Sequence, residues 1–196
     1  MNARVSADSY ATTRRSAIAA SRPRKHDHRM ESHPTPCPPG HRALRGGRFS
    51  TPGQAYLVTT TTRLRRPWFA DWDCARTACA TLHHEAQFAG VTLLAWVLMP
   101  DHWHALLSLD GSRTLSQAVN RLKSTSAIAV NAAVGRRGPV WARAFHDRAL
   151  RADEDALATA RYIVANPVRA GLCAHVGEYP FWNTRWIDAD PASLHP

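Results

Sequence analysis

The sequence has no long apolar run and few cysteines, and both shortages narrow the classes of protein that it can encode. Its longest apolar stretch, Val91 to Met99, falls far short of the roughly 20 residues that a membrane span needs. The N-terminus carries arginines but no apolar block followed by a small-residue cleavage site, so we expect no secretory signal. The four cysteines form no C-x-x-C pair, which argues against a zinc ribbon or a disulfide framework. We therefore expect a cytoplasmic protein with no membrane partner.

Acidic residues are also scarce. The 196 residues include 25 Lys or Arg against 15 Asp or Glu, for a formal net charge of +10. Such an excess favours a polyanionic partner, and nucleic acid is the usual one. Most of the excess lies in the first 50 residues, which hold ten Lys or Arg against three acidic residues and show no apolar periodicity. We predict a disordered basic arm over residues 1–45, one domain over 46–188 and a short tail over 189–196.

The basic arm has two interpretations. Arg42, Arg45 and Arg48 could enter a DNA groove and read a short guide sequence, as basic arms do elsewhere. They could equally form a solvated charged linker, and the residues before them could be a tail without function. The sequence leaves both interpretations open.

Hydrophobic periodicity and turn residues predict the order of the elements. They are strand 55–62, helix 72–89, strands 91–99 and 102–109, helix 115–134, strand 140–149 and helix 153–166. Thr114 is expected to cap the second helix, and Pro167 to stop the last one. This order matches the ferredoxin-like split βαβ arrangement. We predict an α+β fold in which an antiparallel sheet carries helices on one face and leaves the other face for a ligand.

The tripeptide His102-Trp103-His104 begins the third predicted strand. Side chains alternate across a strand, so the two imidazoles point to one face while Trp103 points to the other. Neutral imidazole is the commonest metal ligand, and a pair at this spacing can chelate one divalent ion. Two histidines on a half-buried sheet face would show the same pattern, so the tripeptide alone does not decide between the two.

A second pair of polar residues lies on the last predicted helix. Its apolar residues gather on one side, whereas Tyr162 and Asn166 fall on the opposite side, spaced i, i+4 as surface neighbours. A phenol is a poor nucleophile at neutral pH, so attack on a phosphodiester needs charge neutralisation at the phosphate. A divalent ion held by His102 and His104 would supply it, and Asn166 could add an oxygen ligand suited to Mg²⁺ or Mn²⁺.

Taken together, these motifs resemble the REP-associated tyrosine transposases, single-tyrosine members of the HUH endonuclease superfamily. The resemblance runs from about residue 53 to 186 and rests on 98–104 (LMPDHWH), 140–147 (VWARAFHD) and 162–172 (YIVANPVRAGL). It implies an HUH-type fold in which His102, His104 and Asn166 hold the metal. It further implies that Tyr162 cleaves single-stranded DNA beside hairpins of palindromic repeats, stays joined to the 5′ phosphate and releases a 3′ hydroxyl.

Further basic residues are candidates for contacts with DNA phosphates, which position the nucleic acid without reading its sequence. They are Lys123, Arg136, Arg137, Arg143 and Arg161. A homodimer is possible, in which Tyr162 could serve its own histidines or its partner's.

Other functions would leave different marks on the sequence. A domesticated protein that binds DNA hairpins without transposition would be expected to lose the tyrosine or a histidine, and all are present here. A metal-dependent hydrolase in a (β/α)₈ barrel needs about 250 residues and repeating units. An RNA-binding module with a related sheet would carry aromatic side chains where His102 and His104 stand. The sequence thus favours a tyrosine-dependent DNA endonuclease and strand transferase.

Overall fold

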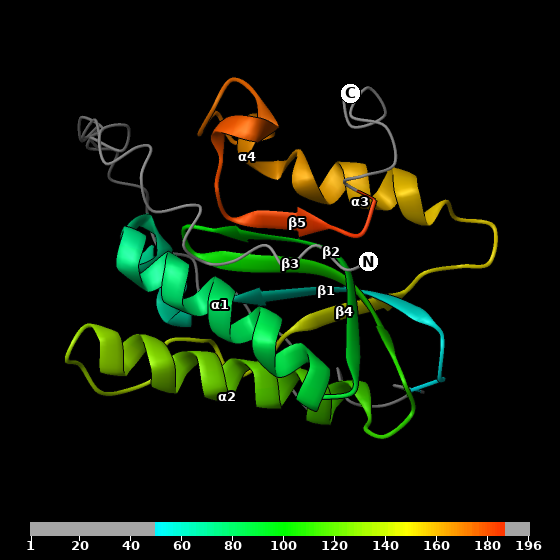
Figure 1. The fold of residues 1–196 in the computed structure, drawn as a ribbon, viewed down its shortest axis with the longest axis horizontal. Coiled ribbons are helices and arrows are strands. Elements are labelled where there is room, and N and C mark those ends of the chain that lie inside the picture. The colour runs from blue at the N-terminus through cyan, green and yellow to red at the C-terminus, as the bar shows by residue number, and fades with distance from the viewer. Residues whose placement is uncertain (1–49, 187–196) are drawn as a thin grey trace, which may run out of the picture. The chain divides into compact units, whose positions relative to one another are not determined.

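Five strands form one antiparallel sheet in the order β4-β1-β3-β2-β5 (Figure 1). The structure, a computed structural model, describes residues 50–186. The predicted arm with Arg42, Arg45 and Arg48, and the predicted tail over 189–196, lie outside these residues. The elements are β1 (Ala55–Thr61), η3 (Arg63–Arg65), η4 (Trp68–Ala70), α1 (Trp72–Phe88), β2 (Val91–Met99), β3 (His102–Leu109), α2 (Leu115–Ala133), β4 (His146–Ala149), α3 (Ala156–Val164), α4 (Asn166–Arg169), η5 (Val176–Glu178) and β5 (Trp182–Thr184).

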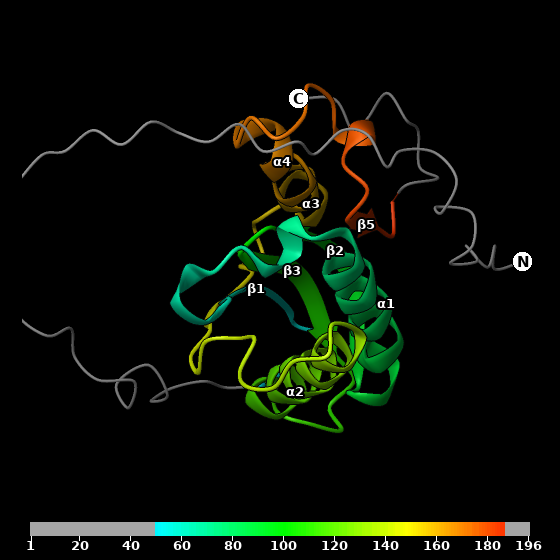
Figure 2. The same ribbon diagram turned by 90° about the vertical axis from the view of Figure 1, so that its left-hand side faces the viewer.

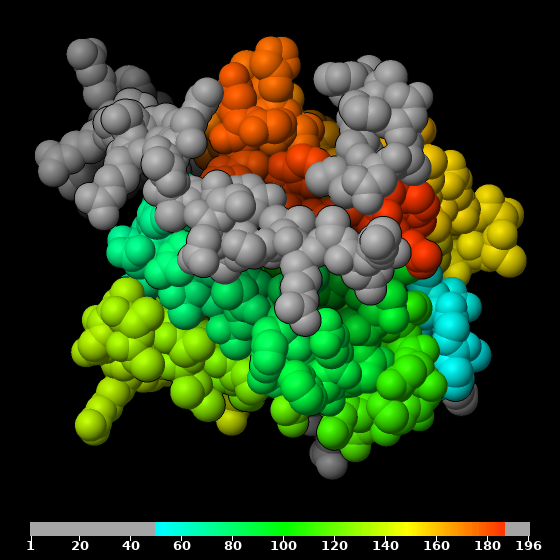
Figure 3. All heavy atoms as spheres, viewed as in Figure 1, coloured from blue at the N-terminus to red at the C-terminus, as the bar shows by residue number. Residues whose placement is uncertain are grey.

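The helices divide between the two faces of the sheet. α1 and α2 lie side by side and contact each other on one face (Figures 1 and 3). α3 lies on the other side of the strands, where it contacts β2, β3 and β5 (Figure 2). The predicted α+β fold with an antiparallel sheet is confirmed. The helices were expected on one face only, whereas α3 covers part of the face that was expected to take a ligand.

Local sequence explains how the helices begin. Asp71 caps α1, because its carboxylate accepts from the Cys74 backbone N–H at 2.9 Å. Thr114 caps α2 as predicted, and Gln117 completes a capping box by accepting from the Thr114 N–H at 2.9 Å. Both helices then direct one apolar side into the core, which they share with the buried residues of the central strands.

Trp103 is one of the largest side chains in this core. It has no exposed surface, and its strand neighbours Thr60 and Leu98 are buried beside it. Because side chains alternate along β3, burial of Trp103 turns His102 and His104 toward the opposite face of the sheet. The burial of Trp103 agrees with the prediction that it points away from the face of the two histidines.

The structure corrects three predicted elements near the C-terminus. The strand expected over 140–149 is short and begins at His146, because residues 140–142 instead bond to the end of β1 through a single bridge and two backbone hydrogen bonds. The last predicted helix ends at Val164, and Pro167 occupies the first turn of a separate short helix, α4, where its missing N–H leaves no bond unmade. The edge strand β5 was not predicted.

In the described part of the chain, no helix combines the length and apolar character needed to cross a membrane.

Candidate active site

The two histidines lie on the central part of the sheet, on the face that α3 shares. His104 stands opposite Thr59 of β1 and Val97 of β2, and His102 stands opposite Thr61 and Met99. Their rings meet edge to face, with centroids 4.7 Å apart. The sheet therefore brings the two imidazoles together, as the alternation of side chains predicts.

Each imidazole is oriented by a hydrogen bond at Nδ1. His102 Nδ1 lies 2.5 Å from Asp101 Oδ1, and His104 Nδ1 lies 2.8 Å from Thr59 Oγ1. When Nδ1 donates the proton to such a partner, Nε2 carries a free lone pair. Metal-bound histidines characteristically use one ring nitrogen in this way, and the outer partner fixes the ring's orientation.

The environment of His104 keeps its ring neutral. Burial lowers the pKa of His104 from 6.5 to about 4, and the positive charges of His102, Arg169 and Arg65 act in the same direction. An imidazole must be unprotonated to bind a metal ion. His104 is therefore in its metal-binding form at neutral pH. α4, which carries Arg169, contacts β2.

Tyr162 is the exposed tyrosine of the described residues, with 63% of its surface accessible. Tyr56 and Tyr179 are both buried, and their hydroxyl groups are bound to the backbone of Thr51 and Leu98. Burial also raises the pKa of Tyr179 far above its ordinary value. Tyr162 projects from α3, whose opposite side supplies Ala160, Ile163 and Val164 to the core. The predicted separation of Tyr162 from the apolar side of its helix is confirmed.

Arg169 connects Tyr162 to Asn166. Its guanidinium lies 3.7 Å from the centre of the Tyr162 ring, and Nη1 donates to the Tyr162 carbonyl oxygen at 2.7 Å. Nη2 donates to Asn166 Oδ1 at 2.7 Å, while Asn166 Nδ2 donates to the Ile163 carbonyl oxygen at 2.9 Å. The amide oxygen of Asn166 thus accepts from Arg169 and keeps a second lone pair for another partner.

The residues present fit a site with two imidazoles and a neutral oxygen. In residues 50–186, no three side chains of His, Cys, Asp or Glu gather as a metal cluster. The carboxylate of Asp101 accepts a hydrogen bond from His102 Nδ1, so it supports the imidazole and is not counted as a metal ligand. A third protein ligand would have to be of another type, and an amide oxygen suits a hard divalent ion.

Lys123 does not lie where a phosphate contact requires it. Only 7% of its surface is exposed, and Nζ donates to the carbonyl oxygens of Arg143 at 3.0 Å and Ala144 at 3.5 Å. Burial lowers the pKa of Lys123 from 10.5 to about 8. Its ammonium group therefore ties α2 to the segment before β4.

The four arginines proposed from the sequence differ in their surroundings. Arg137 and Arg143 are exposed. Arg136 is half-buried, with its guanidinium 4.0 Å from the centre of the Trp68 ring and Nη1 donating to Asn131 at 2.8 Å. Arg161 is also half-buried, and its buried Nε has no hydrogen-bond partner among the described residues. Arg137 and Arg143 are the two most accessible to a phosphate.

Sequence reasoning missed the residues that support the site. The sequence analysis assigned no site role to Asp101, although its place next to His102 was a signal for a supporting carboxylate. The pairing of Thr59 with His104 depends on strand register and left no signal. Arg169 continues the spacing of Tyr162 and Asn166 at i+7, but the expected helix stop at Pro167 concealed it.

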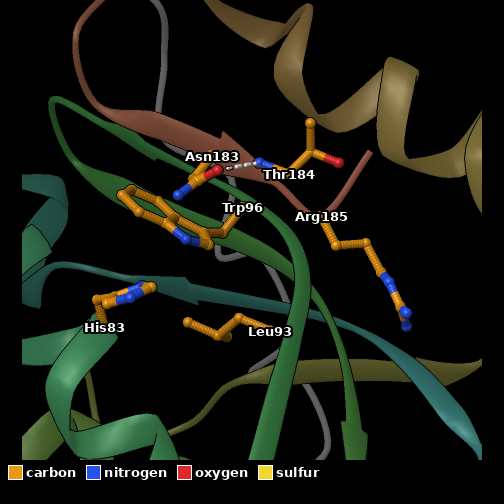
Figure 4. Close-up of a pocket in the computed structure, with 6 residues that line it drawn as sticks. All are labelled: His83, Leu93, Trp96, Asn183, Thr184 and Arg185. Carbon is orange, nitrogen blue, oxygen red and sulfur yellow. Dashed lines mark hydrogen bonds between the residues drawn. The ribbon is translucent and has the colours of Figure 1, made fainter. Parts of the chain in front are cut away.

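A shallow pocket lies at another edge of the domain, between α1, β2 and β5. It is lined by His83, Leu93, Trp96, Asn183, Thr184 and Arg185 (Figure 4). None of the candidate site residues lines it, so this pocket is separate from the candidate active site.

Comparison with known proteins gives both a family and a structural neighbour. A family model described as "Transposase IS200 like" matches residues 51–166. The solved structure of a REP-associated tyrosine transposase bound to a REP hairpin is 25% identical, with a TM-score of 0.57, and the match covers 76% of this chain and 86% of that one. A proposed transposase from Deinococcus radiodurans R1 is 20% identical, with a TM-score of 0.45 and coverage of 68% and 94%. No curated protein matches the chain. The range matched by the family model contains His102, His104, Tyr162 and Asn166.

Proposed function

The chain belongs to the family of IS200-like transposases, and we propose that it is a metal-dependent DNA endonuclease and strand transferase specific for single strands. The observation that carries the proposal is the contrast between the described tyrosines. Tyr162 alone presents its hydroxyl at the surface, on a helix that contacts the strand with His102 and His104. A nucleophile that attacks DNA must be accessible in this way.

In the proposed reaction, the Tyr162 hydroxyl oxygen forms a bond to phosphorus and the bond from phosphorus to the 3′ oxygen breaks. The phenolic proton passes to solvent, and the leaving 3′ oxygen takes up a proton to become a hydroxyl. The product is a 5′-phosphotyrosine, which a 3′ hydroxyl of another strand attacks in the reverse sense to join the DNA and free Tyr162. The phosphodiester bond energy is retained in the intermediate, so strand transfer needs no added energy source.

The residues around Tyr162 have defined tasks in this proposal. Mg²⁺ or Mn²⁺, held by His102, His104 and Asn166, would act as a Lewis acid on the scissile phosphate. Arg169 places a positive charge against the Tyr162 ring, where it stabilises the negative charge that develops on the phenolic oxygen. Arg169 Nη2, which donates to Asn166 Oδ1, would fix the orientation of this amide group for the metal.

The proposed substrate is single-stranded DNA beside a hairpin formed by palindromic repeats. The structural neighbour was solved with a REP hairpin, which supports a DNA hairpin as the partner. Arg136, Arg137, Arg143 and Arg161 are proposed to bind phosphates, and Arg42, Arg45 and Arg48 remain candidates for reading a guide sequence. The buried Lys123 is not included.

Covalent trapping tests the proposal. The full chain is incubated with 3′-labelled hairpin oligonucleotides that carry single-stranded flanks, in Mg²⁺ or Mn²⁺, and analysed on a denaturing gel. We expect a labelled protein adduct, none with Tyr162→Phe or without metal, and none with a fully duplex control. Hairpin binding without an adduct in any condition would instead support a domesticated hairpin-binding protein.

The same assay tests whether Tyr162 acts within its own chain or, in a homodimer, on the partner's histidines. Tyr162→Phe and His102→Ala are each expected to be inactive alone. An adduct formed by their mixture would show that Tyr162 serves the histidines of a partner subunit. Two variants that stay inactive when mixed would mean that each active site is built from one chain.

A further inference from the structure

The turn that follows β1 has a strained backbone. Leu64 has φ 58° and ψ 24°, and the next residue, Arg65, has φ 54°. Two consecutive residues other than glycine in the left-handed region are uncommon, and such strain gathers at ligand-binding and active sites. The strain therefore makes the side chains of this turn candidates for binding a ligand.

Hydrogen bonds from the body of the domain hold this turn in place. The buried Thr62 hydroxyl lies 2.7 Å from the Arg66 carbonyl oxygen and 3.1 Å from that of Asp101. The Arg63 N–H donates to the Val140 carbonyl oxygen at 2.7 Å. None of these bonds involves the side chain of Leu64, so the backbone alone fixes the direction in which that side chain points.

The turn exposes an apolar side chain in the middle of three arginines. Leu64 is 75% exposed, the largest exposure of any large apolar residue described. Arg63 and Arg66 are exposed and have no acidic partner among residues 50–186, and the Arg66 guanidinium lies 5.9 Å from the centre of the Trp68 ring. Packing within the domain therefore does not account for the strain, and the free charges favour an anionic partner over an apolar protein surface.

Arg65 connects the turn to the candidate active site. Its Nε lies 3.1 Å from Asp101 Oδ2, and the other oxygen of that carboxylate accepts from His102. Leu64 thus projects from a segment that is only two side chains away from a proposed metal ligand. DNA held at the histidines would pass close to this turn.

We propose that Leu64 is a wedge that packs against the exposed base at the junction between a DNA hairpin and its single-stranded flank, while Arg63 and Arg66 bind the adjacent phosphates. Apolar side chains such as leucine serve as wedges between bases in other DNA-binding proteins, and arginines beside them bind the backbone. The proposal rests on the proposed function and deepens it, because it states how the enzyme locates a cleavage site relative to a hairpin.

A pair of substitutions separates the wedge from a structural role. Leu64→Asn removes the apolar side chain but tolerates the left-handed backbone better than leucine does, so the melting temperature should hold or rise. Leu64→Met keeps an apolar side chain of similar volume. Ile128→Ala is the control, because it shortens another exposed aliphatic residue, 69% accessible on α2.

Binding is measured by fluorescence anisotropy in metal-free buffer, with a flanked hairpin that carries 2-aminopurine at the junction and with a blunt hairpin. We expect Leu64→Asn to weaken binding of the flanked hairpin about tenfold, in line with the loss of one base contact, and to abolish the 2-aminopurine signal. Leu64→Met and the Ile128→Ala control should bind like the original protein. Arg63→Ala and Arg66→Ala should each lower the slope of log affinity against log salt by about 0.7 to 0.9.

Two results would overturn the wedge: unchanged affinity of a stably folded Leu64→Asn variant, or an equal loss on the blunt hairpin. Failure of the proposed function gives a different pattern, because the binding assay contains no metal and needs no cleavage. A chain that discriminates the junction through Leu64 but never forms an adduct would contradict the proposed function and support the wedge. A chain that forms adducts, and whose Leu64→Asn variant binds the junction as well as the original protein, would support the proposed function and contradict the wedge.

Discussion

The buried Lys123 gives a prediction that separates a structural role from DNA binding. Its ammonium group donates to two carbonyl oxygens and lies 5.9 Å from the centre of the Phe145 ring. Lys123→Met keeps the length of the side chain and removes the charge. Burial lowers the pKa of Lys123 from 10.5 to about 8 in the folded protein. Between pH 8 and 10.5 Lys123 therefore holds a proton in the unfolded chain that it has released in the folded chain, so the contribution of Lys123 to stability rises with pH across this window.

The size of this effect follows from the pKa difference. A shift of this size corresponds to a gain of about 2 to 3 kcal/mol in the contribution of Lys123 to the unfolding free energy between pH 7 and pH 10. Lys123→Met lacks the group and should lack the gain. The difference between the two proteins, measured by urea unfolding at each pH, cancels the titration of the cysteines and tyrosines that both contain.

DNA binding by the same variant completes the test. Lys123→Met should leave the salt dependence of oligonucleotide affinity unchanged, because the ammonium group is bound within the domain. The exposed Arg137→Met serves as the control and should lower the slope by about 0.7 to 0.9, with no change in the pH dependence of stability. The reasoning is refuted if Lys123→Met lowers the salt slope, or if its stability differs from the original by the same amount at every pH.

Two further predictions concern the histidines. Asp101→Asn removes the carboxylate that accepts from His102 Nδ1, so Mn²⁺ affinity measured by calorimetry should fall about 10- to 100-fold, and an unchanged affinity would contradict the supporting role. His104 has a pKa lowered to about 4, so its NMR signals should show a neutral ring at pH 5. As the pH falls from 6.5 to 4, His104 takes up a proton in the unfolded chain but not in the folded protein. The unfolding free energy should therefore decrease as the pH falls, and it should decrease less in His104→Gln.

Local sequence predicted the central strands well. The run from Val91 to Met99 and the strand from His102 to Leu109 have the predicted bounds, because the Pro100-Asp101 turn and the apolar pattern agree. The predicted strand over 140–149 was wrong in its first part, where apolar residues of a loop pack into the core. Val140, Trp141 and Phe145 are buried without forming a strand, so their composition imitated one.

The candidate site, too, could be predicted from the sequence only where it depends on local patterns. The His102 and His104 pair, and the spacing of Tyr162 and Asn166, follow from the periods of one strand and one helix. The bond from Thr59 to His104 joins residues 45 positions apart and depends on the register of β1 against β3. Nor could the sequence indicate that Arg169 holds the amide oxygen of Asn166, since Pro167 suggested that the helix ends there.

The most direct test of the account is to identify the residue that carries the DNA. The adduct formed with a flanked hairpin and Mn²⁺ is digested and its modified peptide sequenced by mass spectrometry. The account predicts a nucleotide phosphate on Tyr162, since Tyr56 and Tyr179 are buried. DNA attached to any other residue, or an adduct that persists in Tyr162→Phe, would contradict it.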